Sequence, residues 1–223
     1  MAEVALPGLR LADDLFFGMH YDITGRMRLH ARLTGLGLAA ALLGELMLAG
    51  RIAVHKVEGE TRLLPAGPPH PGAGAGAGHP EHGQDMVTRA VLDHIVAEPS
   101  HRFRTWLQFI ARTAHADVAT RMTAAALLRP QRMRLSSRYL PVDANQAAWP
   151  VGRLNLAVRR RESLNTQDRV LLGLLVATGV GRHVLWEHNA AYLAQSAAGL
   201  AAPLQELLAQ TEAAVGDAVI SRR

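Results

Sequence analysis

An almost wholly apolar segment, residues 33–49, constrains the fold of this chain more than any other feature. It has the length of a membrane span, but it contains Glu45 and three glycines and is followed at once by Arg51. A charge near the end of a span is costly, whereas a helix that is apolar on every side is equally typical of a bundle core. We therefore expect a buried core helix, capped by Thr34 and ended by Gly50.

The composition agrees with a helical protein that buries one core. Of the 223 residues 49% are hydrophobic but only 4% are aromatic, so the core must consist of Leu, Ala and Val. The absence of cysteine excludes disulfides and cysteine-ligated metals. No basic region followed by an apolar region opens the chain, so we expect no secretory signal and a cytoplasmic protein.

The first fifty residues have a readable order of elements. Residues 9–19 predict an amphipathic helix, with Asp13 and Asp14 near its start, where the helix dipole favours them. Residues 22–25, Asp-Ile-Thr-Gly, predict a turn. Residues 26–29 alternate between polar and apolar and predict a half-buried strand. A β-hairpin is expected from two further segments, 52–57 and 61–64.

The rest of the chain predicts mostly helices. Residues 66–83 are rich in Gly, Pro and His, which is typical of a flexible loop rather than of a metal site built from His70, His79 and His82. A second hairpin is expected over residues 131–142. Helices are expected over 86–97, 100–110, 116–128, 152–161, 170–178 after a Thr166 cap, 183–194, and from Pro203 onwards. The sequence thus predicts a mainly α protein: one domain over residues 1–223, a helical bundle around apolar core helices with two short β-hairpins.

Positive charge is concentrated in the middle of the chain. Residues 101–161 contain twelve arginines and only two acidic residues, Asp117 and Asp143, whereas both flanking regions are net negative. Arginine binds phosphate as a planar fork, so this block favours an anionic partner. A general preference for Arg over Lys on solvated helix faces is the alternative explanation.

No catalytic signature is present in the sequence. A phosphate-binding loop is absent, and Gly179-Val180-Gly181 lacks the third glycine of a dinucleotide fingerprint. Glu187-His188 has no second histidine at zinc-binding spacing. His115 and Asp117 are two residues apart and do not face the same side of a helix. We therefore expect no enzyme, no cofactor and no metal.

Two groups of arginines are candidates for binding. The first lies on and beside the segment predicted as the first strand, where alternation points Arg26 and Arg28 to one face; an exposed strand face without a ligand is the alternative. The second surrounds the second hairpin, where an apolar tip flanked by cations suits a membrane surface; packing of that tip into the core is the alternative. The candidate head-group residues are Arg26, Arg28, His30, Arg32, Arg121, Arg129 and Arg132. The candidate hairpin residues for membrane or oligomer contact are Leu135, Arg138, Tyr139 and Leu140.

The order of these elements resembles the Golgi phosphoprotein 3 family. The N-terminal segment that closes with Glu-Leu-Met-Leu-Ala-Gly-Arg-Ile and the segment Thr-Gln-Asp-Arg-Val-Leu-Leu-Gly-Leu-Leu at 166–175 carry the resemblance. The Ala- and Arg-rich bias is similar to the bacterial branch. The resemblance implies a mostly helical peripheral membrane protein that binds phosphatidylinositol 4-phosphate and places a hairpin at the membrane or at an oligomer contact.

The pocket positions depart from the pattern of that family. A family tryptophan on the first strand and an arginine on the next helix fall on His30 and Ala39 here. Two family arginines on the helix before the second hairpin fall near Ala116 and Ala119, with Arg121 just beyond. The resemblance therefore implies anionic-lipid binding in general rather than phosphoinositide specificity.

The sequence thus leads to one main functional hypothesis and two alternatives. The main hypothesis is a non-enzymatic protein that binds anionic phospholipid head groups peripherally, on the cytosolic face of a membrane. One alternative is a nucleic-acid-binding helical protein, but the chain lacks a helix-turn-helix and an aromatic platform, so no nucleic acid is expected as partner. The other is an adaptor that forms homo-oligomers through the second hairpin.

Overall fold

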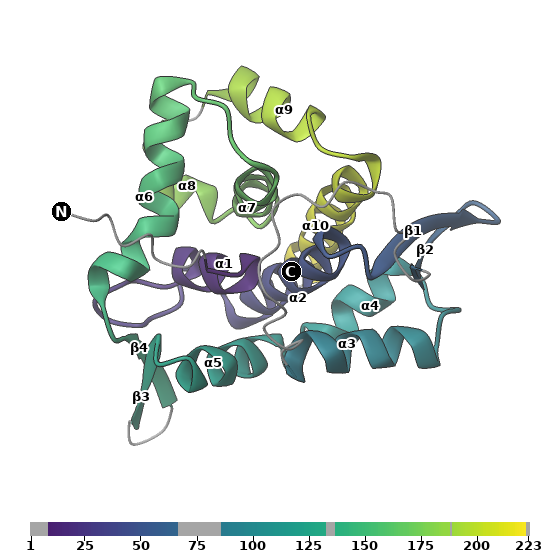
Figure 1. The fold of residues 1–223 in the computed structure, drawn as a ribbon, viewed down its shortest axis with the longest axis horizontal. Coiled ribbons are helices and arrows are strands. Elements are labelled where there is room, and N and C mark those ends of the chain that lie inside the picture. Colours follow the sequence, from purple (N-terminus) through teal and green to yellow (C-terminus); the bar gives the residue numbers. More distant parts are fainter. Residues whose placement is uncertain (1–8, 67–85, 133–136, 188, 222–223) are drawn as a thin grey trace.

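The computed structural model describes residues 9–66, 86–132, 137–187 and 189–221. Figure 1 shows helices packed around a central pair, with two small hairpins at the periphery. The helices are α1 (Leu11–Met19), α2 (Ala31–Leu48), α3 (Met86–Ala97), α4 (Phe103–Ile110), α5 (Ala114–Ala124), α6 (Ala144–Arg160), α7 (Thr166–Ala177), α8 (Gly181–Val184), α9 (Ala190–Ala198) and α10 (Ala202–Ile220). The strands are β1 (Ile52–Val57), β2 (Glu60–Pro65), β3 (Leu128–Arg132) and β4 (Ser137–Pro141). The predicted class, mainly α with two short hairpins, is confirmed.

Helix α2 lies at the centre of the bundle, as its apolar sequence predicts. It contacts α1, α3, α4, α5, α7 and α10. Among the described residues it is the one helix long and apolar enough to cross a membrane, and 67% of it is buried inside the protein. Close approach of neighbouring elements requires glycine here: a Cβ at Gly35 would collide with the carbonyl of Ala111, and one at Gly37 would collide with Met19. The segment 33–49 is therefore a core helix.

Helix α1 differs from the amphipathic helix that the sequence predicts. All nine of its residues are buried, including Asp13 and Asp14. Buried carboxylates require charged partners, and arginines from α5 and α6 supply them: Arg121 binds Asp13, and Arg153 binds Asp14. The polar side of α1 thus faces other helices rather than water.

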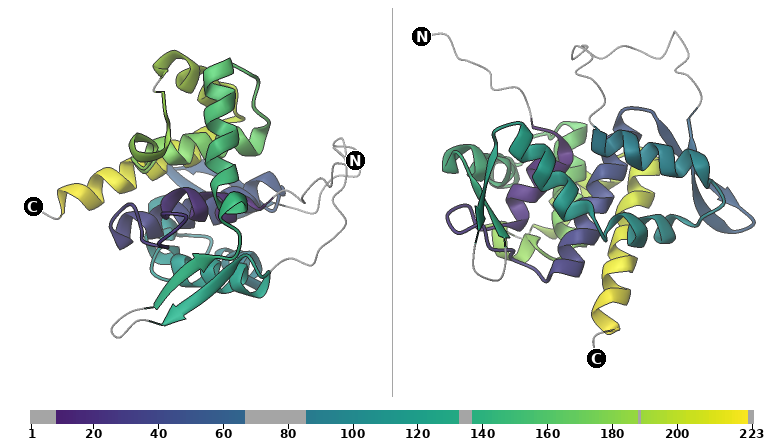
Figure 2. Two further views of the ribbon diagram at one scale, coloured as in Figure 1. Left: turned by 90° about the vertical axis from the view of Figure 1, so that its left-hand side faces the viewer. Right: turned by 90° about the horizontal axis from the view of Figure 1, so that it is seen from below.

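Both predicted hairpins form, each as a two-stranded antiparallel sheet. The β1–β2 pair runs in register from Ile52 opposite Pro65 to Val57 opposite Glu60. The β3–β4 pair runs from Leu128 opposite Pro141 to Arg132 opposite Ser137, so it starts three residues earlier than expected. Figure 2 shows the second hairpin extending away from the helices, with the end of α10 projecting from another side.

Several local predictions are wrong. Residues 26–29 form no strand; Met27 makes a single bridge to His20. His30, not Thr34, caps α2, because the helix begins one turn earlier than its apolar pattern. Asn165 rather than Thr166 caps α7. The span 183–194 contains parts of two helices, α8 and α9, and not one.

Some element boundaries also differ from expectation. Helix α5 ends at Ala124, so Leu128 belongs to a strand, and α6 starts at Ala144 behind an Asp143 cap, well before residue 152. Of the expected flexible segment 66–83, all but Ala66 lies outside the described residues, together with the three histidines within it. The buried apolar side chains of the described helices form one contiguous cluster.

Candidate functional site

Arg121, a predicted head-group residue, lies in the interior. Its Nη2 is 2.6 Å from Oδ1 of Asp13, and its Nη1 is 2.9 Å from Oε2 of Glu45, with the Arg121 side chain only 9% exposed. The second oxygen of Glu45 also accepts a hydrogen bond from the backbone nitrogen of Ala12, at 2.8 Å. Arg121 therefore ties α5 to α1 and α2 and is not available to an external phosphate.

A second arginine, Arg153, repeats this arrangement on the other side of α1, with its side chain 21% exposed. Nη2 of Arg153 is 2.6 Å from Oδ2 of Asp14 and 2.8 Å from Oδ1 of Asp168. Burial raises the pKa of Asp14, and it raises that of Asp13 to about 6 against the opposing effect of Arg121. We call Arg121, Arg153 and their carboxylates the interior arginine network.

An open pocket of about 430 Å³ lies where the start of α2, α5 and the second hairpin meet. We call it the histidine pocket. The residues that line it are His20, Gly25, Arg26, Met27, Leu29, His30, Ala31, His115, Arg138 and Tyr139. It therefore brings together Arg26, His30, Arg138 and Tyr139 from the two predicted groups, which lie more than a hundred residues apart in the sequence.

Two neutral histidines form one wall of this pocket. Nδ1 of His20 lies 2.7 Å from the carbonyl oxygen of Phe16, and because a carbonyl only accepts, this nitrogen must carry the proton. Nε2 of His20 then accepts from Nε2 of His115, 3.1 Å away. Burial lowers the pKa of His20 to about 4, aided by His115 and Arg28, and burial also lowers the pKa of His115. The positive charge of the pocket therefore comes from its arginines.

The arginines of the pocket differ from those of the interior. Arg26 is exposed and Arg138 is half-buried, and within the described residues neither has a carboxylate partner at ion-pair distance. Tyr139 is fixed edge-to-face on His115, with ring centroids 6.0 Å apart. His30 uses Nδ1 to accept from the backbone nitrogen of Arg32 at 3.2 Å, which leaves Nε2 for the pocket. Two guanidinium groups and an imidazole thus remain for an anionic ligand.

An apolar turn forms the outer rim of the pocket. The backbone nitrogen of Gly25 donates to the carbonyl of Tyr21 at 2.8 Å, and Gly25 has a φ of +61°. A side chain at Gly25 would also collide with the backbone of Tyr139, so the turn packs directly on β4. The turn presents Ile23, which is 80% exposed, with Tyr21 and Met27 beside it at 45% and 39%. An exposed apolar tip next to cations is the arrangement that a membrane surface recognises.

The other predicted residues lie outside the pocket. The guanidinium of Arg28 sits 4.2 Å from the ring centroid of Tyr21, and Arg32 lines a separate hollow with Gln108 and Arg112. Arg129 is exposed on β3. The side chains of Arg132 and Leu135 lie outside the described residues.

Two of the candidate hairpin residues are half-buried: Tyr139 faces the pocket, and a methyl group of Leu140 lies against Gly25. Among the described residues around the pocket, Ile23 is the most exposed apolar side chain. The predicted site residues did not include Ile23, Met27, His20 or His115. The i, i+4 spacing of Phe16 and His20, the residue that caps the end of α1, was the one available signal. In the structure these two rings stack with centroids 4.0 Å apart.

The comparisons with known proteins agree with the order of the elements. No curated protein matches the chain. A family model, however, covers nearly all of the described structure, from the first turn of α1 to the end of α10. The chain belongs to the Golgi phosphoprotein 3 (GPP34) family, whose model matches residues 11–220.

Proposed function

We propose that this protein binds the surface of anionic phospholipid membranes peripherally, with a head-group phosphate in the histidine pocket. The observation that carries the proposal is the position of Arg26 and Arg138. They line one pocket, lack carboxylate partners among the described residues, and lie beside the exposed tip Ile23. A phosphate in the pocket would accept charge-assisted hydrogen bonds while Ile23 enters the acyl boundary.

The distribution of the other arginines supports a lipid partner over a nucleic acid. Of the twelve arginines in residues 101–161, Arg121 and Arg153 are held in the interior. Arg102 pairs with Glu60 and Arg104 with Asp217 on the surface. The positive block of the sequence is therefore divided in space, whereas a nucleic acid requires a continuous track of cations.

The family supports the same proposal, because the lipid binding that the resemblance implies would use this part of the fold. The resemblance puts His30 where the family has a tryptophan, and His30 lines the pocket. Phosphatidylinositol 4-phosphate is one ligand that the proposal includes. We place the protein on the cytosolic face of a membrane as part of this proposal.

Vesicle co-sedimentation tests the proposal. We expect the protein to sediment with vesicles that contain phosphatidylglycerol or phosphatidylinositol 4-phosphate, and to remain in solution with pure phosphatidylcholine. Ile23→Ser should reduce sedimentation with anionic vesicles, because it removes the apolar anchor but no charge. Ile220→Ser is the matched control, since Ile220 is 72% exposed at the end of α10, away from the pocket. Equal sedimentation with charged and neutral vesicles would refute the proposal.

A further inference from the structure

Helix α9 has an apolar sequence but no buried residue. It reads Ala-Ala-Tyr-Leu-Ala-Gln-Ser-Ala-Ala, and none of these side chains is fully covered. Figure 1 shows it at the edge of the molecule, and its main packing partner is α7. A helix of this composition normally gains its stability by burying an apolar face. The chain itself leaves that face of α9 only partly covered.

An apolar groove runs beneath α9. It has a volume of about 290 Å³ and is bounded by α7, α9 and α10, with lining side chains that include Leu172, Val176, Leu193, Leu208 and Ala209. The groove follows α7 from Arg169 to Val176, which spans roughly 11 Å at the helical rise per residue. Val176 is 45% exposed at its far end. The groove therefore has the length and the largely apolar lining that suit one hydrocarbon chain, with Glu212 as its acidic lining residue.

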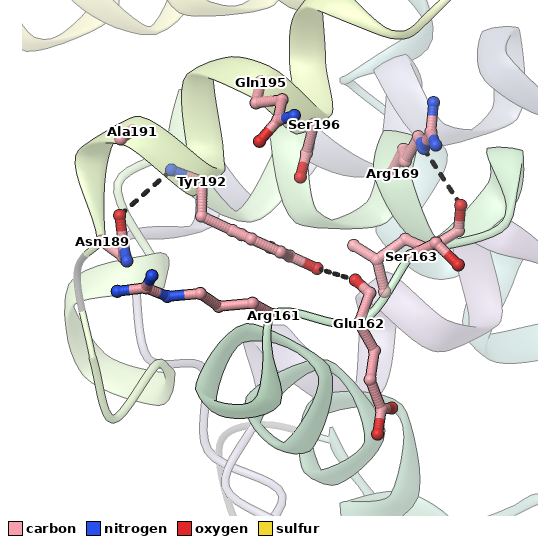
Figure 3. A pocket seen from close by; sticks show the side chains of 10 residues that line it. Arg161, Glu162, Ser163, Arg169, Asn189, Ala191, Tyr192, Gln195 and Ser196 are labelled. Atoms are coloured by element: carbon pink, nitrogen blue, oxygen red, sulfur yellow. Dashed lines mark hydrogen bonds between the residues drawn. The ribbon is translucent and has the colours of Figure 1, made fainter.

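A polar pocket of about 390 Å³ continues this groove at the Arg169 end. The two cavities share Arg169 and Ser196 as lining residues. Figure 3 shows the polar pocket, in which the hydroxyl of Tyr192 donates to the carbonyl of Glu162 at 2.8 Å. Nε of Arg169 donates to the carbonyl of Leu164 at 3.0 Å, so its guanidinium is held in place at the junction.

The charge of the polar pocket is positive. Arg161 and Arg169 both line it, and Arg161 has no carboxylate partner at ion-pair distance within the described residues. In Figure 3 the carboxylate of Glu162 points away from Tyr192. Glu162 also lines the pocket, and its carboxylate lies 3.5 Å from Arg160. The lining thus has two arginines against one carboxylate, which pairs with an arginine outside the lining.

The backbone at Arg161 adds an independent observation. It has a φ of +54° and ends α6 by a turn in which the nitrogen of Glu162 donates to the carbonyl of Ala157 at 3.0 Å. Glycine is the usual residue at this position, because a Cβ is unfavourable in the left-handed region. Arg161 adopts this unfavourable conformation, and its side chain lines the polar pocket. Strain of this kind is concentrated at functional positions.

We propose that α7, α9 and α10 bind a single-chain amphiphile with an anionic head, either a carboxylate or a phosphate. The head lies in the polar pocket that Arg161 and Arg169 line, and the hydrocarbon chain lies in the groove against Leu193 and Leu208. The polar cavity matches an anionic head, and the adjoining apolar groove matches a hydrocarbon tail. The hydrocarbon tail would cover the open face of α9. This site is separate from the histidine pocket and goes beyond the proposed membrane binding.

Calorimetric titration of the full chain tests this site with three ten-carbon probes below their micelle concentrations. We expect one equivalent of decanoate or decyl phosphate to bind, and uncharged decyl glucoside to bind about tenfold more weakly or worse. Whichever anionic probe binds more tightly identifies the head group. Equal binding of decyl glucoside would overturn the proposal.

Two variants separate the head site from the groove. Arg161→Gln should weaken binding of the anionic probe by about tenfold, whereas Arg159→Gln on the exposed side of α6 should not. Ala194→Trp should fill the groove and abolish binding, whereas Ala148→Trp, on an exposed part of α6, should not.

The remaining outcomes are also decisive. If circular dichroism shows that Ala194→Trp is unfolded, Ala209→Trp on the opposite wall of the groove replaces it. Retained binding in a folded groove variant, or equal losses from Arg161→Gln and Arg159→Gln, would refute the site. Replacing Arg26 and Arg138 should leave decanoate binding unchanged, which keeps this test distinct from that of the proposed function.

Discussion

Arginine has different roles in the interior arginine network and in the histidine pocket. Arg121 is 9% exposed and contacts two carboxylates, whereas Arg26 is exposed and has none at ion-pair distance among the described residues. A buried charge without its partner costs several kcal/mol, so breaking the network should destabilise the folded protein strongly. A solvated guanidinium at the rim of a pocket costs little and remains available to a ligand.

Whether an arginine is structural or available to a ligand therefore depends on whether the fold places a carboxylate beside it. Asp13, Asp14 and Glu45 lie in the first fifty residues, far in sequence from the arginines that they neutralise. The local charge of a segment therefore does not show which of its arginines face outward.

The largest effect is expected from removing Arg121. Arg121→Met keeps an apolar stem of similar length but removes the guanidinium that pairs with both Asp13 and Glu45. The free energy of unfolding should fall by about 3–5 kcal/mol in urea denaturation. The exposed Arg112→Met serves as control and should change stability by no more than about 0.5 kcal/mol. A loss below about 1 kcal/mol for Arg121→Met would show that the network is not structural.

A smaller effect is expected from the pH dependence of His20. Because its pKa is about 4 in the folded protein and 6.5 otherwise, the folded state binds this proton less readily than the unfolded chain. The resulting stability is complete above pH 6.5 and is lost as the pH falls from 6.5 towards 4. Between pH 7 and pH 5 the loss from His20 should reach about 2 kcal/mol.

Comparison with His20→Gln isolates this contribution. Asp13 acts in the opposite direction, since its raised pKa of about 6 favours the folded state on acidification, and the variant keeps that effect. Urea denaturation of both proteins at pH 7 and pH 5 should show the greater loss in the wild type. Parallel losses in the two proteins would mean that His20 is not held neutral by its burial.

The arginines of the pocket should affect binding rather than stability. Each Arg near an anionic surface contributes about 1 kcal/mol, so Arg26→Gln together with Arg138→Gln should weaken vesicle affinity roughly 30-fold. The melting temperature should remain nearly unchanged. Arg159→Gln with Arg160→Gln is the matched control on α6. Equal losses of affinity from both pairs would indicate a diffuse positive surface without a pocket.

The smallest effect concerns Arg161, which belongs to neither group. Glycine is preferred at its φ of +54°, so Arg161→Gly should raise the free energy of unfolding by about 1 kcal/mol in urea. Arg159→Gly, within the last helical turn, should instead lower it, because glycine is unfavourable in a helix. A stabilised variant that no longer binds decanoate would identify Arg161 as retained for binding and not for folding.

Much of the fold could be predicted from the sequence because its signals are local. The apolar segment of α2, the strands of β1–β2 and the range of α3 follow from periodicity and turn residues, and the structure agrees with them. Where the chain departs from prediction, tertiary contacts decide. Met27 is drawn into a bridge with His20 instead of a strand, and α1 buries its acidic side because Arg121 and Arg153 neutralise it.

The candidate site was less predictable than the fold. Arg26, His30, Arg138 and Tyr139 were identified by residue type and spacing, and the structure places them in one pocket. Arg121 belongs to the same positive segment as Arg138, yet its partners lie on α1 and α2, so only the fold assigns it to the interior. The His20–His115 contact joins residues 95 apart, and no local pattern reveals such a pair.

One NMR titration with short-chain phosphatidic acid, below its micelle concentration, tests the histidine pocket and the interior arginine network together. We expect saturable shifts of the ring signals of His30 and His115 and of the amide of Gly25, all of which line the pocket. The backbone amides of Arg121 and Arg153 should not shift. Shifts centred on the interior network, or equal shifts with glycerophosphocholine, would contradict the claim that the histidine pocket receives an anionic head group.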